Sequence, residues 1–197
     1  RETIRAYRDL DVLMNHLHLP IQSGNNEILK SMRRDHTVEE YLELIYELKS
    51  EVPDVSLTTD IIVGFPGETD PQFQDTLRVM ERVGYSSSFM FSYSPRPGTP
   101  ANEFEDSVSE DVKSKRLQEI IQLQNRLTEE QGRLYKGETI EILIEGSSGK
   151  PGYSFKGRNP QYWRVNATGG EGLYKPGDRV QVHIDQTSGH GLSGEIQ

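Results

Sequence analysis

The chain has 197 residues, of which 33% are hydrophobic and 27% charged, and its formal net charge is −9. This length suits one large or two modest domains, since single cores usually occupy about 100 to 200 residues. No run approaches the roughly 18 apolar residues that span a bilayer, and segment 1–14 is too charged for a signal peptide. We therefore expect a cytoplasmic protein without a membrane partner. Because the first residue is Arg, we also expect a piece of a longer chain.

The chain has no cysteine, which excludes disulfides, zinc–thiolate sites, iron–sulfur ligation and thiol nucleophiles from this stretch. The acidic charge argues against a surface that coats nucleic acid generally. It is also uneven, because from Gly137 onward six Lys or Arg face seven Asp or Glu. The acidity therefore belongs to the front of the chain, and the tail is nearly neutral.

Three apolar runs in the front part are predicted to be strands, at 17–24, 55–65 and 85–94. Pro20 and Gly24 interrupt or end the first run. Helical patterns fill both gaps between the runs. Strand and helix repeating in this way predict parallel strands joined by crossover helices, and three such units amount to part of a barrel or of a wound sheet.

The two predicted helices have start signals of their own. Thr37 and Glu40 have the spacing of a capping box, and the first helix continues with apolar positions at helical spacing, namely Tyr41, Leu42, Ile45 and Leu48. The second helix is expected to have Asp70 as N-cap and Pro71 at its first position. Its predicted apolar face consists of Phe73, Leu77 and Met80.

A longer amphipathic helix is predicted from Ser109, its expected cap, to Tyr135, and it would connect two domains. Its predicted apolar stripe consists of Leu117, Ile120, Ile121, Leu127 and Leu134. About five short alternating runs follow, separated by Gly, Ser and Pro. They predict a small all-β, OB-like barrel, a fold that often binds nucleic acid. We thus expect one domain at 1–135 and another at 136–197.

Ligands of parallel α/β folds bind beyond the carboxyl ends of the strands. The first predicted end offers Gln22 and Ser23, and the second offers the segment from Gly64 to Glu68. There Pro66 and Gly67 suit a type II turn, and Gly64, lacking a Cβ, could let a flat ligand lie against the backbone. A convenient strand-to-helix loop without a ligand is an equal alternative.

The third strand end carries Arg96 between two prolines, which hold it in an extended loop suited to gripping a carboxylate or phosphate. A surface salt bridge is the alternative for this residue. Asp60, near the end of an apolar strand, could bind a ligand or tie down a loop. His16 and His18 point to one face, but without a third ligand nearby we predict no metal site.

The tail stretch "FKGRNPQYWRVN" interleaves cations with aromatics, which can neutralise phosphates and stack on unpaired bases. Its cations are Lys156, Arg158 and Arg164, and its aromatics are Phe155, Tyr162 and Trp163. Packing of the aromatics in the core of the barrel is the alternative. It suits Phe155 better than Trp163.

Several motifs resemble one known family, the methylthiotransferases of the radical S-adenosylmethionine (SAM) superfamily. They are "HLPIQSGNNEILKSMRRDHTVEEY", "TTDIIVGFPGET" and "YSPRPGTPA", in this order. They are similar to the second half of the radical SAM barrel, a partial TIM-like barrel, and the tail resembles the TRAM domain of the same family. Within the family, "GRNPQYWRVNATG" is most similar to the branch that acts on transfer RNA.

The resemblance implies an enzyme that adds a methylthio group to C2 of N6-isopentenyladenosine at position 37 of tRNA. It implies SAM and two [4Fe-4S] clusters as cofactors. The ligands of both clusters, including a Cys-x3-Cys-x2-Cys loop, are expected upstream of Arg1, so the fragment should be inactive alone and holds no catalytic residue. The implied partners are a tRNA anticodon stem-loop, a reductant and a sulfur donor.

The resemblance also implies roles for single residues. The implied cofactor-binding residues are Gln22, Ser23, Arg34, Asp60, Gly64, Phe65 and Arg96, and the predicted RNA-binding residues are Lys156, Arg158, Asn159, Trp163 and Arg164. The superfamily pattern Gly-x-Ile-x-Gly-x-x-Glu meets Asp60 at its first Gly and Gly67 at its Glu, with Glu68 next in the chain.

Two alternatives to the tRNA enzyme stay open at this point. One is the related branch that modifies an aspartate of a ribosomal protein, which "WRVNATG" disfavours. The other is a non-catalytic RNA-binding module.

Overall fold

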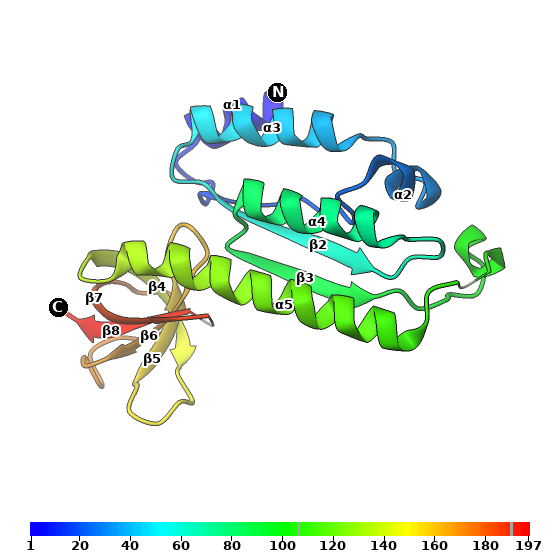
Figure 1. The fold of residues 1–197 in the computed structure, drawn as a ribbon. Coiled ribbons are helices and arrows are strands. Elements are labelled where there is room, and N and C mark those ends of the chain that lie inside the picture. Colours follow the sequence, from blue (N-terminus) through cyan, green and yellow to red (C-terminus); the bar gives the residue numbers. More distant parts are fainter. Residues whose placement is uncertain (106, 190) are drawn as a thin grey trace. The chain divides into compact units, whose positions relative to one another are not determined.

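The computed structural model describes residues 1–105, 107–189 and 191–197. Its contacts divide the chain into two compact units. The first, here called the sheet unit, comprises Leu17–Pro53 and Leu57–Leu127. The second, the barrel unit, comprises Arg1–His16, Asp54–Ser56 and Thr128–Gln197. The chain is a mixed α/β protein, as predicted, with helices around parallel strands in one unit and a small closed barrel in the other (Figure 1).

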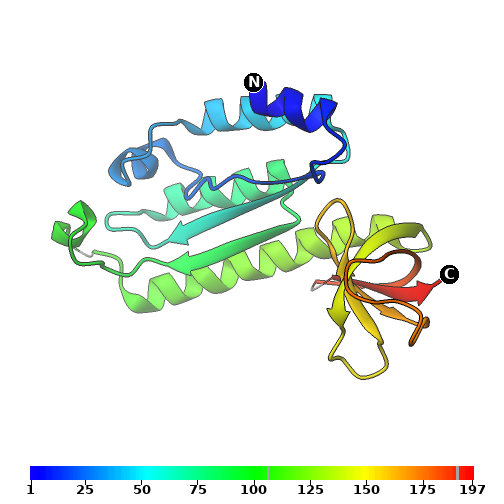
Figure 2. The same cartoon turned by 180° about the vertical axis from the view of Figure 1, so that it is seen from behind.

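The sheet unit alternates strands and helices along the chain. Its elements are β1 (His16–His18), α2 (Asn26–Ser31), α3 (Val38–Glu51), β2 (Ser56–Val63), α4 (Asp70–Val83), β3 (Ser87–Ser92), the 3-10 helix η1 (Pro100–Glu103) and α5 (Glu110–Gly132), of which β1, β2 and α5 extend into the barrel unit. The sheet order is β1-β2-β3, and β2 and β3 are parallel, with Asp60 opposite Phe89. Figure 2 shows this pair from behind, still side by side.

The helix starts follow from local chemistry, with one correction. At α3 the capping box is confirmed, because Thr37 Oγ1 accepts from the Glu40 amide and Glu40 Oε2 accepts from the Thr37 amide at 2.8 Å. At α4 the N-cap is Thr69 and not Asp70. Gln72 accepts from the Thr69 amide at 2.9 Å, so a second capping box moves Asp70 into the first turn, where an acid is favourable.

One face of the sheet is packed against helices. Its buried side chains on β2 include Leu57, Ile61 and Val63. On the same face of β3, the Ser88 hydroxyl donates to Gln124 of α5 at 2.9 Å. The strands and the helices on this face therefore share one core. This core fixes the position of the carboxyl ends of the strands.

The first predicted strand is shorter than expected. The apolar run suggested residues 17–24, but β1 ends at His18, and Gln22 keeps only an isolated bridge to Ile61. Pro20 has no amide hydrogen to donate to the sheet, which explains the early end. Residues 19–24 instead form an irregular segment beside β2, to which the amides of Leu19 and Gln22 donate hydrogen bonds.

The stripe predicted for the connecting helix is partly wrong. The cap is confirmed, because Ser109 Oγ accepts from the Val112 amide at 3.4 Å. Ile120 and Leu127 are buried as predicted, whereas Ile121 and Leu134 are exposed. Two cations, Lys113 and Arg116, take part in the buried face instead. The α-helix ends at Gly132, and a 3-10 turn (η2, Arg133–Tyr135) follows.

Besides η2 and the ends of β1, β2 and α5, the described part of the barrel unit contains one helix and five strands. They are α1 (Glu2–Asp9), β4 (Thr139–Ser147), β5 (Phe155–Arg158), β6 (Arg164–Thr168), β7 (Arg179–Ser188) and β8 (Gly191–Ile196). The strands close in the order β4-β5-β6-β8-β7, and all pairs are antiparallel except β6 with β8. A cluster of buried Ile, Val, Leu, Ala and Trp side chains fills the interior. The five predicted strands are confirmed.

Among the described residues, none of the helices has both the length and the apolar character that crossing a bilayer requires.

Candidate functional site

A cavity of about 630 Å³ lies at the carboxyl ends of β2 and β3. The segment after β1, the arginines after α2 and the loop after β3 all contribute to its wall. Five of the seven residues predicted to bind a cofactor line it, namely Gln22, Arg34, Asp60, Phe65 and Arg96. A larger hollow of about 740 Å³ lies between α3 and α4, but the strand ends are where ligands of parallel sheets bind.

Two lining residues have unusual backbone conformations. Gln22 has φ 71° and Arg33 has φ 57°, the left-handed region that side chains other than Gly rarely adopt. Such residues cluster at functional sites, where the surrounding structure holds them. Here the Gln22 amide donates to Asp60 O and its carbonyl accepts from the Ile62 amide, both at 2.9 Å. β2 therefore fixes the strained segment.

The charge of the cavity is mainly positive. Arg33, Arg34 and Arg96 all line it and are exposed. Asp60 is an acid on the same wall, and its carboxylate lies 3.5 Å from Nε2 of His18. Guanidinium groups around a hollow suit a carboxylate or a phosphate. The sequence assigned only Arg34 to the site, whereas both of the adjacent arginines line the cavity.

Aromatic side chains set the apolar side of the cavity. Phe65 is 4% exposed and packs edge-on against Tyr93 and Phe104, with ring centroids 5.1 and 6.2 Å apart. The Tyr93 hydroxyl donates to Ala101 O at 2.9 Å. These contacts hold the loop that carries Arg96 over the end of β2.

Two predicted cofactor residues do not line this cavity. Ser23 is fully buried. Gly64, with φ 71°, faces the side chain of Lys113, whose Cγ would lie 2.4 Å from an added Cβ. The missing Cβ of Gly64 therefore makes room for Lys113, not for a flat ligand as the sequence suggested. The predicted type II turn is confirmed, because Gly67 has φ 83° and the Glu68 amide donates to Phe65 O.

Glu68 is the buried acid behind this turn. Its Oε2 accepts from the Gly64 amide at 2.7 Å and from Arg116 Nη1 at 2.9 Å, while Arg116 Nη2 reaches Asp70 at 2.6 Å. Burial raises the pKa of Glu68, although Arg116 and the Gly64 amide oppose the shift. The hydrogen bond from Arg116 lowers the pKa of Asp70. This network positions the loop of Phe65, and the sequence offered no sign of Arg116.

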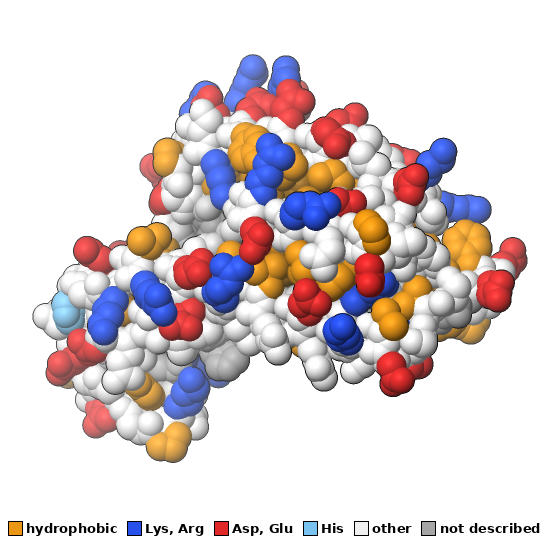
Figure 3. Space-filling view, viewed as in Figure 1, with side chains coloured by type: hydrophobic (Ala, Val, Ile, Leu, Met, Phe, Trp, Pro, Cys, Tyr) orange, Lys and Arg blue, Asp and Glu red, His pale blue; other side chains and the backbone are white. Residues whose placement is uncertain are grey.

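A second hollow, of about 560 Å³, lies on the barrel unit. Predicted residues Lys156, Arg158 and Arg164 line it, together with Lys150 and the acid Glu145. On the face of the molecule in Figure 3, Lys and Arg are interspersed with Asp and Glu. For the binding of an anionic partner, the gathering of cations in one hollow therefore matters more than the net charge of the chain.

Arg158 is the most constrained of these cations. Its Nη1 pairs with Glu145, and its guanidinium lies 4.3 Å from the centroid of the Tyr162 ring. Tyr162 also stacks on His16 at 4.5 Å. A guanidinium held in this way can donate hydrogen bonds to an anion from a fixed position. Glu145 already takes up one of its donor groups, Nη1.

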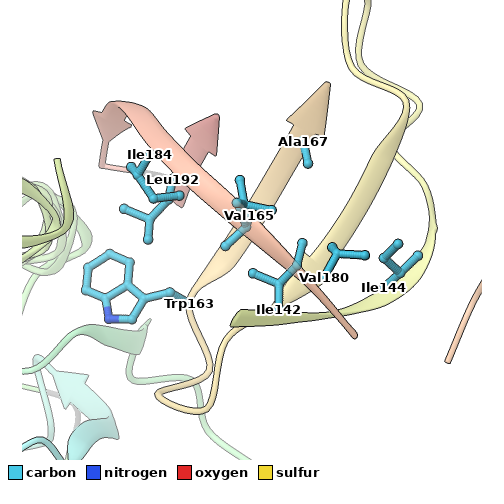
Figure 4. Close-up of a cluster of buried hydrophobic side chains, with 9 residues drawn as sticks. Ile142, Ile144, Trp163, Val165, Ala167, Val180, Ile184 and Leu192 are labelled. Atoms are coloured by element: carbon cyan, nitrogen blue, oxygen red, sulfur yellow. The ribbon is translucent and has the colours of Figure 1, made fainter. Parts of the chain in front are cut away.

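Asn159 and Trp163 require a correction. Trp163 is only 6% exposed and belongs to the barrel core shown in Figure 4. The ring centroids of Tyr135 and Trp163 lie 5.6 Å apart. Trp163 therefore offers no free ring face for stacking on a base. Asn159 is 2% exposed, and its Oδ1 accepts from the Trp163 amide at 2.8 Å. Both residues build the barrel rather than its surface.

Two family profiles match the chain. "Radical SAM superfamily" matches residues 1–80 and "TRAM domain" matches residues 133–196. Among solved structures, coproporphyrinogen III oxidase (HemN) from Escherichia coli, a radical SAM enzyme, shares the fold with a TM-score of 0.54 and 18% identity, over 97% of this chain and 47% of that chain.

Curated relatives resemble the chain over nearly its whole length. The tRNA-2-methylthio-N(6)-dimethylallyladenosine synthase of Protochlamydia amoebophila is 44% identical over 100% of this chain, and proteins of the same name from Thermoanaerobacter and Desulfotalea psychrophila are 43% and 44% identical over 99%. The chain spans only 43%, 41% and 43% of these relatives. The two profiles thus match the chain in the order that its motifs predicted, and the chain is similar throughout to these synthases.

Proposed function

We propose that the chain is the part of a tRNA methylthiotransferase that forms one wall of the cofactor site and docks the RNA. The intact enzyme would add a methylthio group to C2 of N6-dimethylallyladenosine, also called N6-isopentenyladenosine, at position 37 of tRNA. The observation that carries the proposal is the cavity at the ends of β2 and β3, which five sequence-predicted residues share. The names of the relatives support the same reaction.

The residues of the cavity fit SAM. Arg34 and Arg96 would hold its carboxylate, Gln22 and Asp60 would hydrogen-bond its polar groups, and Phe65 supplies an apolar support. When bound beside a reduced [4Fe-4S] cluster, SAM supplies the radical chemistry of the superfamily. The chain has no cysteine, so the ligands of both clusters would lie in the remainder of the protein. The residues of this chain bind and orient.

The barrel unit would dock the anticodon stem-loop. Lys156, Arg158 and Arg164 share one hollow, and phosphate contacts dominate affinity for RNA even when they are few. The finer assignments follow from the same family: an OB-like TRAM barrel at 136–197, the second half of a partial TIM-like barrel at 1–135, a cytoplasmic location, and a reductant and a sulfur donor as further partners.

Binding of SAM to the full-length protein tests the cavity directly. Arg96→Ala and Arg34→Ala should each weaken binding about tenfold or more, as loss of a charge-assisted contact predicts, measured by isothermal titration calorimetry. Arg78→Ala is the control, because this exposed arginine pairs with Asp75 on α4, away from the cavity. Unchanged affinity in both cavity variants would contradict the assignment of the site.

A further inference from the structure

β3 carries two large aromatic side chains on its open face. Phe89 is 61% exposed and Phe91 is 51% exposed. Their neighbour Ser88 points to the opposite face, where it bonds to Gln124 of α5. Parallel strands are normally covered on both faces, and a buried Phe removes about 150 Å² or more from water. A pair of exposed phenylalanines at this position therefore indicates a surface that another group covers.

The two rings are continuous with the candidate cofactor cavity. Phe91 itself lines the cavity, and it lies opposite Ile62 of β2, which lines it too. Phe89 lies one step further from the strand end, opposite Asp60. We call Phe89, Phe91 and Ile62 the aromatic wall. An apolar group bound against this wall would be adjacent to a ligand in the cavity.

Contacts from β1 hold Phe89, the residue of the wall furthest from the carboxyl end of β3, in place. The His18 ring packs edge-on against Phe89 at 6.1 Å. His18 is itself fixed, because its Nδ1 lies 3.0 Å from Thr58 Oγ1 and its Nε2 lies 3.5 Å from Asp60. The aromatic wall is thus an apolar strip with a polar border, the arrangement of a pocket that binds and orients one side of a ligand.

We infer that the aromatic wall recognises the apolar N6 substituent of the adenosine to be modified. The inference rests on the proposed function, and it deepens that function by naming the specificity determinant. The wall offers no charge and no hydrogen-bond donor or acceptor, so it cannot read the edge of a base or a phosphate. The arginines that line the adjoining cavity suit anionic groups. Among the parts of the substrate that the relatives' names describe, the branched hydrocarbon is the one that matches an aromatic strip.

Binding of two stem-loop RNAs to the full-length protein tests the inference. One RNA carries dimethylallyladenosine next to the anticodon and the other carries plain adenosine. The wild-type protein should bind the modified RNA at least tenfold more tightly, since even one methylene in an apolar pocket is worth about 10- to 200-fold. Phe89→Ala and Phe91→Ala should bring this ratio close to one, whereas Phe89→Leu should retain most of it.

The control is Ser87→Ala, on the same face of β3 but distant from the strand end, and it should keep the full ratio. Affinity for the unmodified RNA should not change in any variant, because the barrel unit sets it. A wild-type ratio of one, or an undiminished ratio in both alanine variants, would overturn the inference while leaving the proposed function in place. If the wild-type protein binds neither RNA nor SAM, the proposed function itself fails.

The remainder of the full-length chain is the competing occupant of the wall. In that case, Phe89→Ala would lower the melting temperature of the full-length protein by several degrees, as loss of a core side chain does, and the RNA ratio would be unaffected. That combination also overturns the inference. Loss of binding to both RNAs by an alanine variant would reflect misfolding, and the ratio in Phe89→Leu and Phe91→Leu would then decide.

Discussion

Arg116 of α5 and Glu68, in the turn after β2, form a hydrogen-bonded ion pair of 2.9 Å in which the Glu68 side chain is fully buried. The pair joins two segments 48 residues apart in the chain. Because Glu68 also accepts from the Gly64 amide, the helix determines the shape of the turn that carries Phe65. The cavity at the strand ends therefore depends on a helix whose residues are not among those that line it.

Arg116→Met should lower the free energy of unfolding by about 3 to 5 kcal/mol, because removing one partner leaves the other charge buried and unpaired. Urea unfolding followed by helical circular dichroism measures this change. Arg126→Met is the matched control on the same helix. Its ion pair with Glu81 has side chains 52% and 54% exposed, so we expect a loss below about 1 kcal/mol. Equal losses would show that the buried pair has no special role.

The raised pKa of Glu68 predicts a particular pH dependence. A carboxyl whose folded pKa lies above its unfolded value, 4.5 for Glu, binds more protons in the folded state, so it stabilises the fold as pH falls. Relative to Glu68→Gln, the wild-type chain should gain stability as pH falls through the folded pKa toward 4.5, and the gain should level off below that pH. The measurement is urea unfolding of both proteins at several pH values. A difference that stays constant with pH would contradict the raised pKa.

Gly64 and Gly67 allow a matched comparison of two glycines in the loop after β2. Both have positive φ, 71° and 83°, but only Gly64 has a side chain, Lys113, in the space of a Cβ. Gly67→Ala should therefore cost about 1 kcal/mol from backbone strain alone. Gly64→Ala should cost clearly more and should also weaken SAM binding, because Lys113 must move. Thermal unfolding and calorimetric titration measure the two effects, and equal costs would contradict this account.

Arg158→Ala should weaken binding to the anticodon stem-loop about tenfold and reduce the salt dependence of binding by about one phosphate contact. Glu145→Gln should have the opposite effect and strengthen binding, because it releases Arg158 from its carboxylate partner. Arg179→Ala is the control, since Arg179 is 74% exposed in its side chain and does not line the hollow. Filter binding at several salt concentrations measures all three, and weaker binding by Glu145→Gln would contradict the proposed competition.

Local signals predicted most elements of the chain. The capping box at Thr37, the turn at Pro66 and Gly67, and the five short strands of the tail all depend on neighbours in sequence, and the structure confirms them. The position of Arg96 beyond the end of β3 also followed from the order of the predicted strands. Where chemistry is local, residue types and spacing were sufficient.

The wrong predictions concern side chains whose burial depends on contacts with residues far away in the sequence. Arg116 and Lys113 interrupt the expected apolar stripe of α5, because their partners, Glu68 and the surface of Gly64, lie more than forty residues away. Trp163 was expected at the surface beside Arg158, but the closed barrel needs its volume inside. Periodicity cannot show which long side chain finds a buried partner, or which aromatic fills an interior.

The two strand assemblies differ in their free edges. In the barrel unit every described strand has two neighbours, whereas in the described part of the sheet unit β3 has only β2, so its other edge has no neighbouring strand there. An exposed strand edge is a template for pairing with a strand of another chain. The exposed side chains of Phe89 and Phe91 favour such association. If this 197-residue stretch is produced by itself, self-association should begin at β3. Replacing single residues of β3 by charged residues should then keep the protein monodisperse, whereas changes to the barrel should not.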